Sequence, residues 1–423
     1  MSTRDRLTLP GILATLGPGL VWAAAAIGVS HLVQSTRAGA SYGFALVGVV
    51  VVANVLKYPF FEYGPRYAAA TGESLVEGYR RQGAWAVWVY LVLTFGTMFA
   101  VLAAVTFVTG SLATQLFGDG LSAFVYSAGL LAVCAAILVP GRYPLLDKVV
   151  KAIMVVLAVS TVAAVVLAVT AGEGREAVQA GVDPWGPATF PFLIALVGWM
   201  PSAVDISVWN SLWTLERAKE TRHKPRLREA LFDFNLGYWG TVVLALCFLS
   251  LGALVFFGSG REVAESPGAF AVQLIDLYAA ALGPWARPLI VVAAFTTMFS
   301  TTLTVTDAFP RALDRTTRVL VPSLGVEGRP AGLYWGWMVV LVGGALLLMS
   351  VFRQSLLGMV DLATTLSFLT SPVLGVLNYR AVTASHMPAG TAPPRWMRAL
   401  TWVGLAFGFV FAGIYLLWRL GLV

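Results

Sequence analysis

The sequence predicts an all-α integral membrane protein, and three observations carry this prediction. Hydrophobic residues fill 58% of the 423 positions and charged residues only 12%, whereas soluble globular domains contain about 25% charged residues. The mean hydropathy is +0.80. The apolar residues form long runs separated by short polar loops, and a run of roughly 18 apolar residues or more can cross a bilayer as a helix.

Eleven such runs follow one another along the chain. They lie at 12–36, 43–68, 85–113, 122–140, 147–170, 189–215, 231–258, 286–309, 332–351, 356–379 and 397–420. No soluble domain or nucleotide-binding motif interrupts them, so we expect one membrane domain over residues 1–423 that is neither an enzyme nor an ATP-driven pump. Its expected partners are the lipid bilayer and a small transported ion or solute, with no nucleic acid, obligate protein partner or resident cofactor.

The net charge of +7 is a signal of topology rather than of nucleic-acid binding, because the basic residues gather in alternate loops. Cytoplasmic loops of membrane proteins carry an excess of lysine and arginine. We therefore expect a multi-pass protein of the plasma or inner membrane with a cytoplasmic amino terminus and, after eleven crossings, an external carboxyl terminus. The basic loops are the amino terminus, 66–84, 141–151, 216–230, 310–331 and 380–398.

The sixth predicted helix is interrupted in its middle. Pro201 removes a backbone donor and clashes with the preceding turn, and Gly198 and Ser202 loosen the same region, so the helix should divide near Met200. Backbone groups freed at this depth are tolerated only where they face protein or a polar cavity. A broken helix of this kind indicates the substrate site of a transporter.

The first predicted helix has a similar interruption. Its small residues from Ala24 to Ser30 lie in the middle of the span and are followed by His31. Two broken helices five apart indicate a five-plus-five inverted repeat of the leucine-transporter type, in which helices 1 and 6 cross at the substrate site. Repeat one would cover about 12–170 and repeat two about 189–379, with an extra helix at about 397–420.

Several stretches resemble the Nramp family of divalent-metal transporters. The run RAGASYGFALVGVVVVAN from Arg37 and the run ATGESLVEGYR from Ala70 are similar to its signature for the first two helices. VGWMPSAVDISVWNS from Val197 resembles its sixth-helix Met-Pro-His motif, and STTLTVT from Ser300 resembles its Ser/Thr-rich eighth helix. The resemblance covers the ten-helix core and implies a secondary-active transporter that moves a divalent metal by alternating access.

The chain departs from the family pattern at the metal positions. Gly28 stands where the family carries its metal-binding aspartate, and Ser202 stands where it carries a histidine. The third helix, where the resemblance predicts acidic residues on a proton path, has no ionisable group from Thr94 to Gly110. A sodium- or proton-coupled transporter of a small anion, amino acid or other non-metal solute is therefore the alternative, and a sensor that binds without transport is a third hypothesis.

Three side chains are candidate metal ligands: His31, Met200 and Asp205. Imidazole and thioether groups suit borderline or soft metals, and a buried carboxylate could replace the missing aspartate. Each also has a structural interpretation, because the histidine can satisfy backbone groups, the methionine can fill a core gap, and the aspartate can face the positive end of its own half-helix. The predicted substrate site comprises Gly28, His31, Val197, Met200, Ser202 and Asp205.

The hydroxyl-rich eighth helix offers candidates for a coupling ion. Hydroxyls of transporters with this architecture meet carbonyls of the unwound first helix at a sodium site, so the resemblance implies Thr301 and Thr302, with Asp307 as a further contributor or proton acceptor. The alternative is close helix packing, which such hydroxyls commonly serve in membranes. On the second helix, Lys57 and Glu62 are either an internal ion pair or gate, or residues near the cytoplasmic interface.

Overall fold

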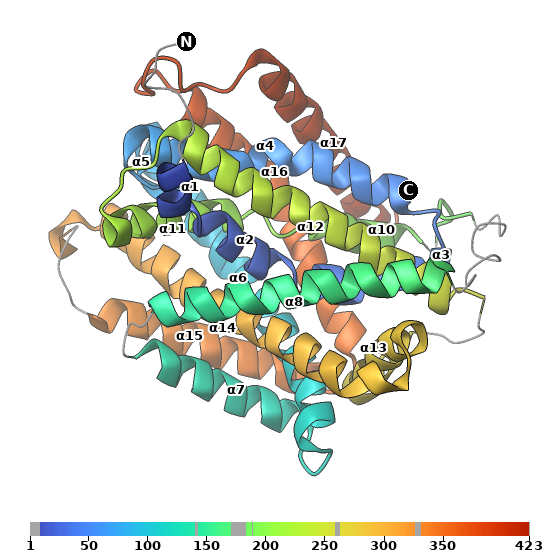
Figure 1. Cartoon of the computed structure of the whole chain (residues 1–423). Coiled ribbons are helices and arrows are strands. Elements are labelled where there is room, and N and C mark those ends of the chain that lie inside the picture. Colours follow the sequence, from blue (N-terminus) through green and yellow to red (C-terminus); the bar gives the residue numbers. More distant parts are fainter. Residues whose placement is uncertain are drawn as a thin grey trace.

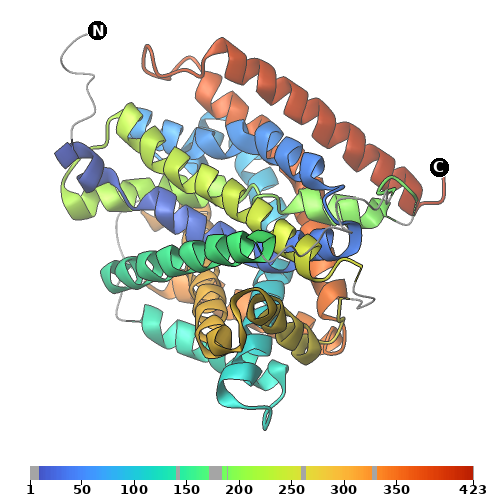
Figure 2. The same cartoon turned by 45° about the vertical axis from the view of Figure 1, so that its right-hand side comes forward.

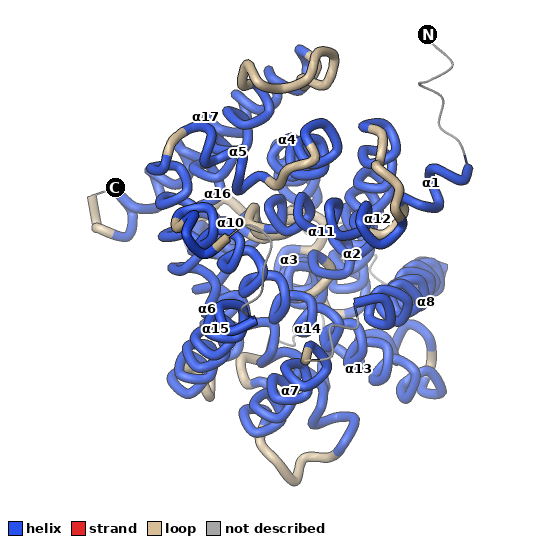
Figure 3. Tube along the Cα trace, turned by 90° about the vertical axis from the view of Figure 1, so that its left-hand side faces the viewer, coloured by secondary structure: helices blue, strands red, loops and turns tan. Residues whose placement is uncertain are grey.

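The computed structural model describes residues 9–139, 143–170, 183–187, 189–258, 263–325 and 331–422. All regular elements in these ranges are helices, as Figures 1 and 3 show. The predicted all-α class is confirmed. Residues 1–8 and parts of the loops at 141–151 and 310–331, on which the topology prediction draws, lie outside the described residues.

The predicted interruption of the first helix is confirmed. Its pieces are α1 (Leu9–Thr15), α2 (Pro18–Ala26), the π-helical turn η2 (Ser30–Ser35) and α3 (Thr36–Tyr42), with the break at residues 27–29. The sixth helix is also broken, into α10 (Phe190–Gly198) and α11 (Ile206–Thr221), and the Met200–Pro201 peptide between them is cis. The break is longer than predicted, so Asp205 precedes α11 instead of lying within it.

The remaining helices are mostly continuous. They are α4 (Val47–Thr71), α5 (Leu75–Gln82), α6 (Ala84–Phe117), α7 (Ala123–Leu138), α8 (Tyr143–Thr170), α12 (Leu227–Val255), α13 (Pro267–Leu282), α14 (Arg287–Leu320), α15 (Ala331–Val351), α16 (Leu356–Thr383) and α17 (Arg395–Arg419), with 3₁₀ turns η3 (Pro284–Ala286) and η4 (Pro322–Leu324). The short helix α13 was not expected. It falls in the predicted loop between the seventh and eighth spans and packs against α6, α8 and α14.

Six helices in the described part of the chain are long and apolar enough to cross a membrane. They are α6, α12, η3 with α14, α15, α16 and α17. The halves of the broken helices are shorter, and α4 carries Lys57, Glu62 and Arg66 within its 25 residues. The protein is therefore a multi-pass membrane protein, and the total of eleven spans stays a prediction.

The broken helices lie at the centre of the bundle. The α12 helix packs on α2 and α3, α14 packs on α6 and α2, and α16 packs on α10. In Figures 1 and 2, α17 lies along one side of the molecule, and α7 and α13 lie along the opposite side. The long helices α6, α12, α14 and α16 thus surround the two breaks.

Candidate transport site

A small cavity lies where the two breaks meet. It has a volume of about 20 Å³, and its polar lining comes from Ser30 of η2, Ser202 of the helix-6 break and Thr301 of α14. Trp199 and Trp209 also line it, together with small and aliphatic residues. No carboxylate is among these lining residues. A space of this size holds about one water molecule or one bare ion, so an amino acid would fit only if the helices moved apart.

Thr301 joins α14 to the break in helix 1. Its Oγ1 lies 2.9 Å from the carbonyl oxygen of Ala24 and 3.3 Å from that of Ile27, both of which accept from this hydroxyl. Gly28 lies directly against it, because a Cβ at that position would be 3.0 Å from the Thr301 Cγ2. Thr301 therefore caps the carbonyl end of α2.

The other two predicted coupling residues make different contacts. The Thr302 hydroxyl bonds the Thr109 hydroxyl of α6 at 2.7 Å and the Met298 carbonyl of its own helix. Asp307 accepts from Arg311 at 2.9 and 3.0 Å and from the Tyr334 hydroxyl at 2.8 Å. Of the three predicted coupling residues, the structure thus places only Thr301 against helix 1.

His31 points away from the cavity toward α12. Its Nε2 lies 3.0 Å from the carbonyl oxygen of Thr241, and its Nδ1 lies 2.7 Å from the Ser30 hydroxyl. A carbonyl can only accept, so Nε2 carries the hydrogen, and in the neutral ring Nδ1 shares the single Ser30 hydroxyl hydrogen with the Ala26 carbonyl oxygen, 2.8 Å from that hydroxyl. Both ring nitrogens are therefore engaged, and neither offers a free lone pair to a metal.

Met200 and Asp205 also make separate contacts. Met200 is fully buried in an apolar cluster that includes Phe192, Leu196 and Phe368. The Asp205 carboxylate, which is 1% exposed, accepts from the hydroxyls of Thr94 and Thr97 on α6 at 3.4 Å each. The predicted metal ligands His31, Met200 and Asp205 are therefore not gathered into one ligand set in this conformation.

Asp205 differs from the other buried carboxylates. In the part of the chain that the structure describes, these are Glu62, Asp205, Glu229, Asp233 and Asp307. The other four accept from arginine, histidine or backbone N–H groups. For Asp205 the described residues supply only two long hydroxyl contacts. Thr97 is four residues before Val101, which lines the cavity, so the carboxylate lies about one helical turn from the cavity wall.

Lys57 was not predicted to touch the helix-6 break, and the predicted ion pair with Glu62 is wrong. Its side chain is buried, and its Nζ donates to the carbonyl oxygens of Val197 at 2.5 Å and Gly198 at 2.8 Å. Glu62 pairs with Arg66 at 2.6 Å instead. Val197, a predicted substrate residue, thus has its carbonyl occupied by this ammonium. The only sequence signal was a lysine in an apolar run.

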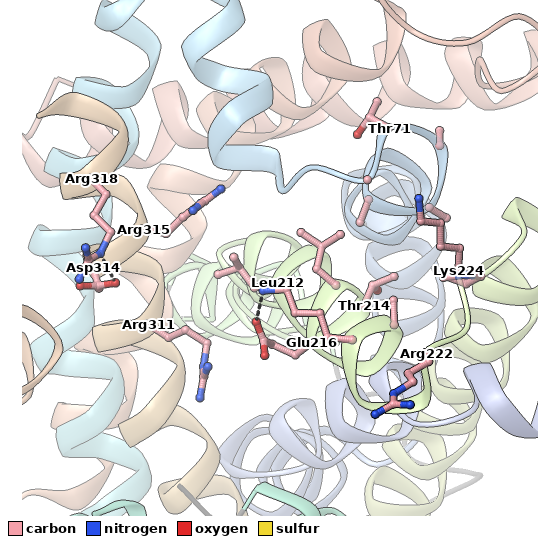
Figure 4. A pocket seen from close by; sticks show the side chains of 18 of the residues that line it. Thr71, Leu212, Thr214, Glu216, Arg222, Lys224, Arg311, Asp314, Arg315 and Arg318 are labelled. Atoms are coloured by element: carbon pink, nitrogen blue, oxygen red, sulfur yellow. Dashed lines mark hydrogen bonds and ion pairs between the residues drawn. The ribbon is translucent and has the colours of Figure 1, made fainter. Parts of the chain in front are cut away.

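A large vestibule of about 1040 Å³ opens at one end of the molecule. As Figure 4 shows, Leu212 and Glu216 of α11 face Arg311 and Arg315 of α14 across it. Its charged lining consists of Lys219, Arg222, Lys224, Arg311, Arg315, Arg318, Glu216 and Asp314. Several of these are paired, but Arg222 and Lys224 have no carboxylate partner among the described residues. The vestibule wall is therefore positively charged.

Aromatic side chains separate the cavity from the vestibule. Trp209 lines the cavity, and Leu212, about one turn later on α11, lines the vestibule. The ring of Trp209 meets the ring of Phe309 from α14 edge to face, with centroids 4.7 Å apart, and both side chains are buried. Trp209 and Phe309 thus pack together between α11 and α14, at the end of α11 that separates the cavity lining from the vestibule lining.

A polar contact joins α3 to α16 at the other end of the bundle. In Figure 1, α5 and α11 lie at the left, and α3 and α10 lie at the right. There Arg37 of α3 donates to both carboxylate oxygens of Asp361 of α16, at 2.9 and 3.0 Å, and Gln34 donates to the same group at 3.0 Å. The Arg37 guanidinium also stacks 4.7 Å above the Phe192 ring of α10. The vestibule thus lies at the basic end, and the Arg37–Asp361 ion pair links α3 to α16 at the opposite end.

Comparison with known proteins agrees with this architecture. The family model for natural resistance-associated macrophage protein-like (Nramp) proteins matches residues 19–419. The uncharacterized protein PM0681 of Pasteurella multocida is 37% identical over 382 residues, which cover 89% of this chain and 87% of that protein. Residues shared over this length indicate common ancestry and one fold.

Two solved structures illustrate the fold. A manganese transporter mutant of Eremococcus coleocola is 15% identical, with a TM-score of 0.73 over 96% of this chain and 86% of that chain. MhsT in complex with L-phenylalanine is 14% identical, with a TM-score of 0.58 over 96% and 98% of the two chains. The match over residues 19–419 confirms the resemblance seen in the sequence, and the chain therefore belongs to the Nramp family of membrane transporters and is not an enzyme.

Proposed function

We propose that this protein is a secondary-active transporter that carries a metal cation, most readily a divalent one, by alternating access through the cavity between its broken helices. The observation that carries the proposal is Asp205, a buried carboxylate for which the described residues supply two hydroxyl contacts and no cation. An unpaired charge at this depth costs on the order of 2.5–3.5 kcal/mol even on the lenient insertion scale. A cationic cargo that reaches it lowers this cost.

The ligands for such a cargo are oxygen atoms. The cavity offers the hydroxyls of Ser30, Ser202 and Thr301, and Asp205 lies about one helical turn away along α6. Oxygen ligands suit hard cations, and a site with few anionic ligands leaves part of the ion's water shell in place. The structurally similar protein of Eremococcus coleocola is named as a manganese transporter, which favours a divalent metal as the first cargo to test.

Contacts on both sides of the cavity support the proposal of alternating access. The Trp209–Phe309 ring contact would open toward the vestibule, and the Arg37–Asp361 ion pair would open toward the opposite side. With basic loops in the cytoplasm, the vestibule faces the cytoplasm and the amino terminus lies inside the cell. We further propose that residues 12–170 and 189–379 are the two inverted repeats, and that 397–420 is an added span.

The test is uptake into liposomes that contain the purified protein and a metal-sensitive fluorophore. We expect saturable Mn²⁺ uptake by the wild type and a loss of about tenfold or more in Asp205→Asn, which removes the charge with little change in shape. Asp276→Asn is the matched control, because Asp276 is exposed on α13 and pairs with Arg287. Equal uptake by wild type, Asp205→Asn and protein-free liposomes would exclude a metal cargo.

A second candidate is a small anion or another non-metal solute driven by sodium or protons. It is favoured by the positively charged vestibule wall and by a cavity lining without a carboxylate, because such a wall attracts anions and repels cations. A thermal-stability screen in detergent distinguishes the two candidates. Stabilisation by bicarbonate or an amino acid, with none by Mn²⁺, would favour the second.

A further inference from the structure

The carbonyl end of α10 is bound by an ammonium group. Lys57 of α4 places its Nζ 2.5 Å from the carbonyl oxygen of Val197 and 2.8 Å from that of Gly198. The last carbonyls of a helix lack intrahelical partners and carry the negative end of the helix dipole. Two converging carbonyls of this kind form a site at which a positive charge is stabilised.

No described residue around Lys57 supplies a competing anion. A small space beside its side chain is lined by apolar side chains of α4, α10, α16 and α17, among them Phe60, Val197, Phe368 and Phe407. No carboxylate is present in this described lining, and Glu62 of the same helix is bound to Arg66. Among the described residues, the partners of the ammonium are therefore two backbone carbonyl oxygens, and carbonyl oxygens are among the ligands that hard cations take.

We infer that the Lys57 ammonium is a resident cation at the carbonyl end of α10, where it occupies a position that a bound metal or alkali ion would otherwise fill. The carbonyl oxygens of Val197 and Gly198, at 2.5 and 2.8 Å from the Lys57 Nζ, would also ligate a small inorganic cation at the same position. The Val197 carbonyl is consequently unavailable to the cargo. It also follows that α10 is fixed to α4 by charge, independently of whether substrate is present.

The inference is tested by removing the amine and supplying a cation from solution. We expect Lys57→Ala, purified in detergent, to melt several degrees below the wild type. Sodium or methylammonium at high concentration should restore most of this difference, whereas an equal concentration of choline should not, because choline is too large for the vacated space. The wild type should respond equally to all three salts, since its site is already occupied.

Phe60→Ala is the matched control. Phe60 lies one turn from Lys57, is buried and borders the same small space, so its truncation removes packing without removing charge. We expect it to lower the melting temperature without rescue by sodium or methylammonium. Lys57→Gln serves as a second variant if the alanine variant does not fold, because the amide keeps N–H donors but has no charge. It should melt between Lys57→Ala and the wild type and should also respond to small cations.

Two outcomes would overturn the inference. One is that neither lysine variant melts below the wild type. The other is that both are destabilised but sodium, methylammonium and choline have equal effects, which would make Lys57 a structural donor only. These measurements require no transport, so they succeed or fail separately from the proposed function.

Discussion

The break in helix 1 is closed by uncharged groups, whereas the break in helix 6 lies between two buried charges. In helix 1, the hydroxyl of Thr301 caps the carbonyls of Ala24 and Ile27. In helix 6, Lys57 binds the carbonyl end of α10 and Asp205 stands at the amide end of α11. Each of these charges has the sign that stabilises the helix end it faces.

This difference indicates that the polar contacts of the two breaks differ in how easily a cargo can displace them. A hydroxyl that caps carbonyls can exchange its hydrogen bond for a cargo at a small net cost, because a neutral hydrogen bond contributes only about 0.5–1.5 kcal/mol. A buried ammonium held by two carbonyls is much harder to displace. In the proposed mechanism, helix 1 with α14 is therefore the adaptable side of the site. The first half of helix 6 is the fixed side, and Asp205 contributes charge from its second half.

The largest expected effect tests the fixed side. A Cβ at Gly198 would lie 2.1 Å from the backbone carbonyl oxygen of Thr364 in α16, and a backbone atom cannot move aside as a side chain can. We expect Gly198→Ala to lower the free energy of unfolding by about 3 kcal/mol or more, measured by thermal unfolding and size-exclusion chromatography in detergent. Gly343→Ala is the control, because no atom lies within 4 Å of its added Cβ. Equal stability of the two variants would contradict a close backbone contact at α10.

The next effect tests the adaptable side. Thr301→Val keeps the shape of the side chain but leaves the carbonyls of Ala24 and Ile27 without their cross-helix donor. We expect a loss of about 1–3 kcal/mol in unfolding free energy and a clear loss of transport in liposomes. Thr304→Val removes a hydroxyl that bonds only its own helix, at Ser300, and should retain transport. If the two valine variants transport equally well, the Thr301 hydroxyl has no special role.

A smaller gain of binding is expected when charge is added to the uncharged break. Gly28→Asp supplies a carboxylate there, and Thr301→Ser removes the Cγ2 that would lie 3.0 Å from the new Cβ. We expect the double variant to bind Mn²⁺ about tenfold more tightly than the wild type, equivalent to about 1.4 kcal/mol, as measured by metal-dependent thermal shift. Gly28→Asn with Thr301→Ser has the same shape without the charge. Identical Mn²⁺ affinity of both double variants would show that a carboxylate at this break does not face the cargo.

The smallest effect is expected at Met200. Its side chain is packed in an apolar cluster, and a volume-conserving exchange in a core usually costs less than about 1.5 kcal/mol. We therefore expect Met200→Leu to retain both fold and transport, with uptake measured as a function of Mn²⁺ concentration. A tenfold rise in the Mn²⁺ concentration needed for half-maximal uptake would instead place the thioether on the cargo.

Properties that depend on local sequence were predicted correctly. Long apolar runs require helices in a membrane, because unpaired backbone groups are costly in lipid. Pro201 and the small residues around Gly28 predicted the two interruptions. The helices α5 and α13 were missed because they carry polar or charged residues within short stretches, and only long apolar runs mark spans.

The partners of the polar side chains were decided by the tertiary structure. Sequence spacing placed Lys57 near Glu62 and grouped His31 with Met200 and Asp205, but these side chains bind groups on helices far away in the chain. A helix end exposes carbonyls or amides without regard to residue type, so the sequence does not show that α10 offers a site for an ammonium. The sequence alone therefore determined the helices and the location of their breaks, and only the packing of α4, α6, α12 and α14 around those breaks decided which charges they hold.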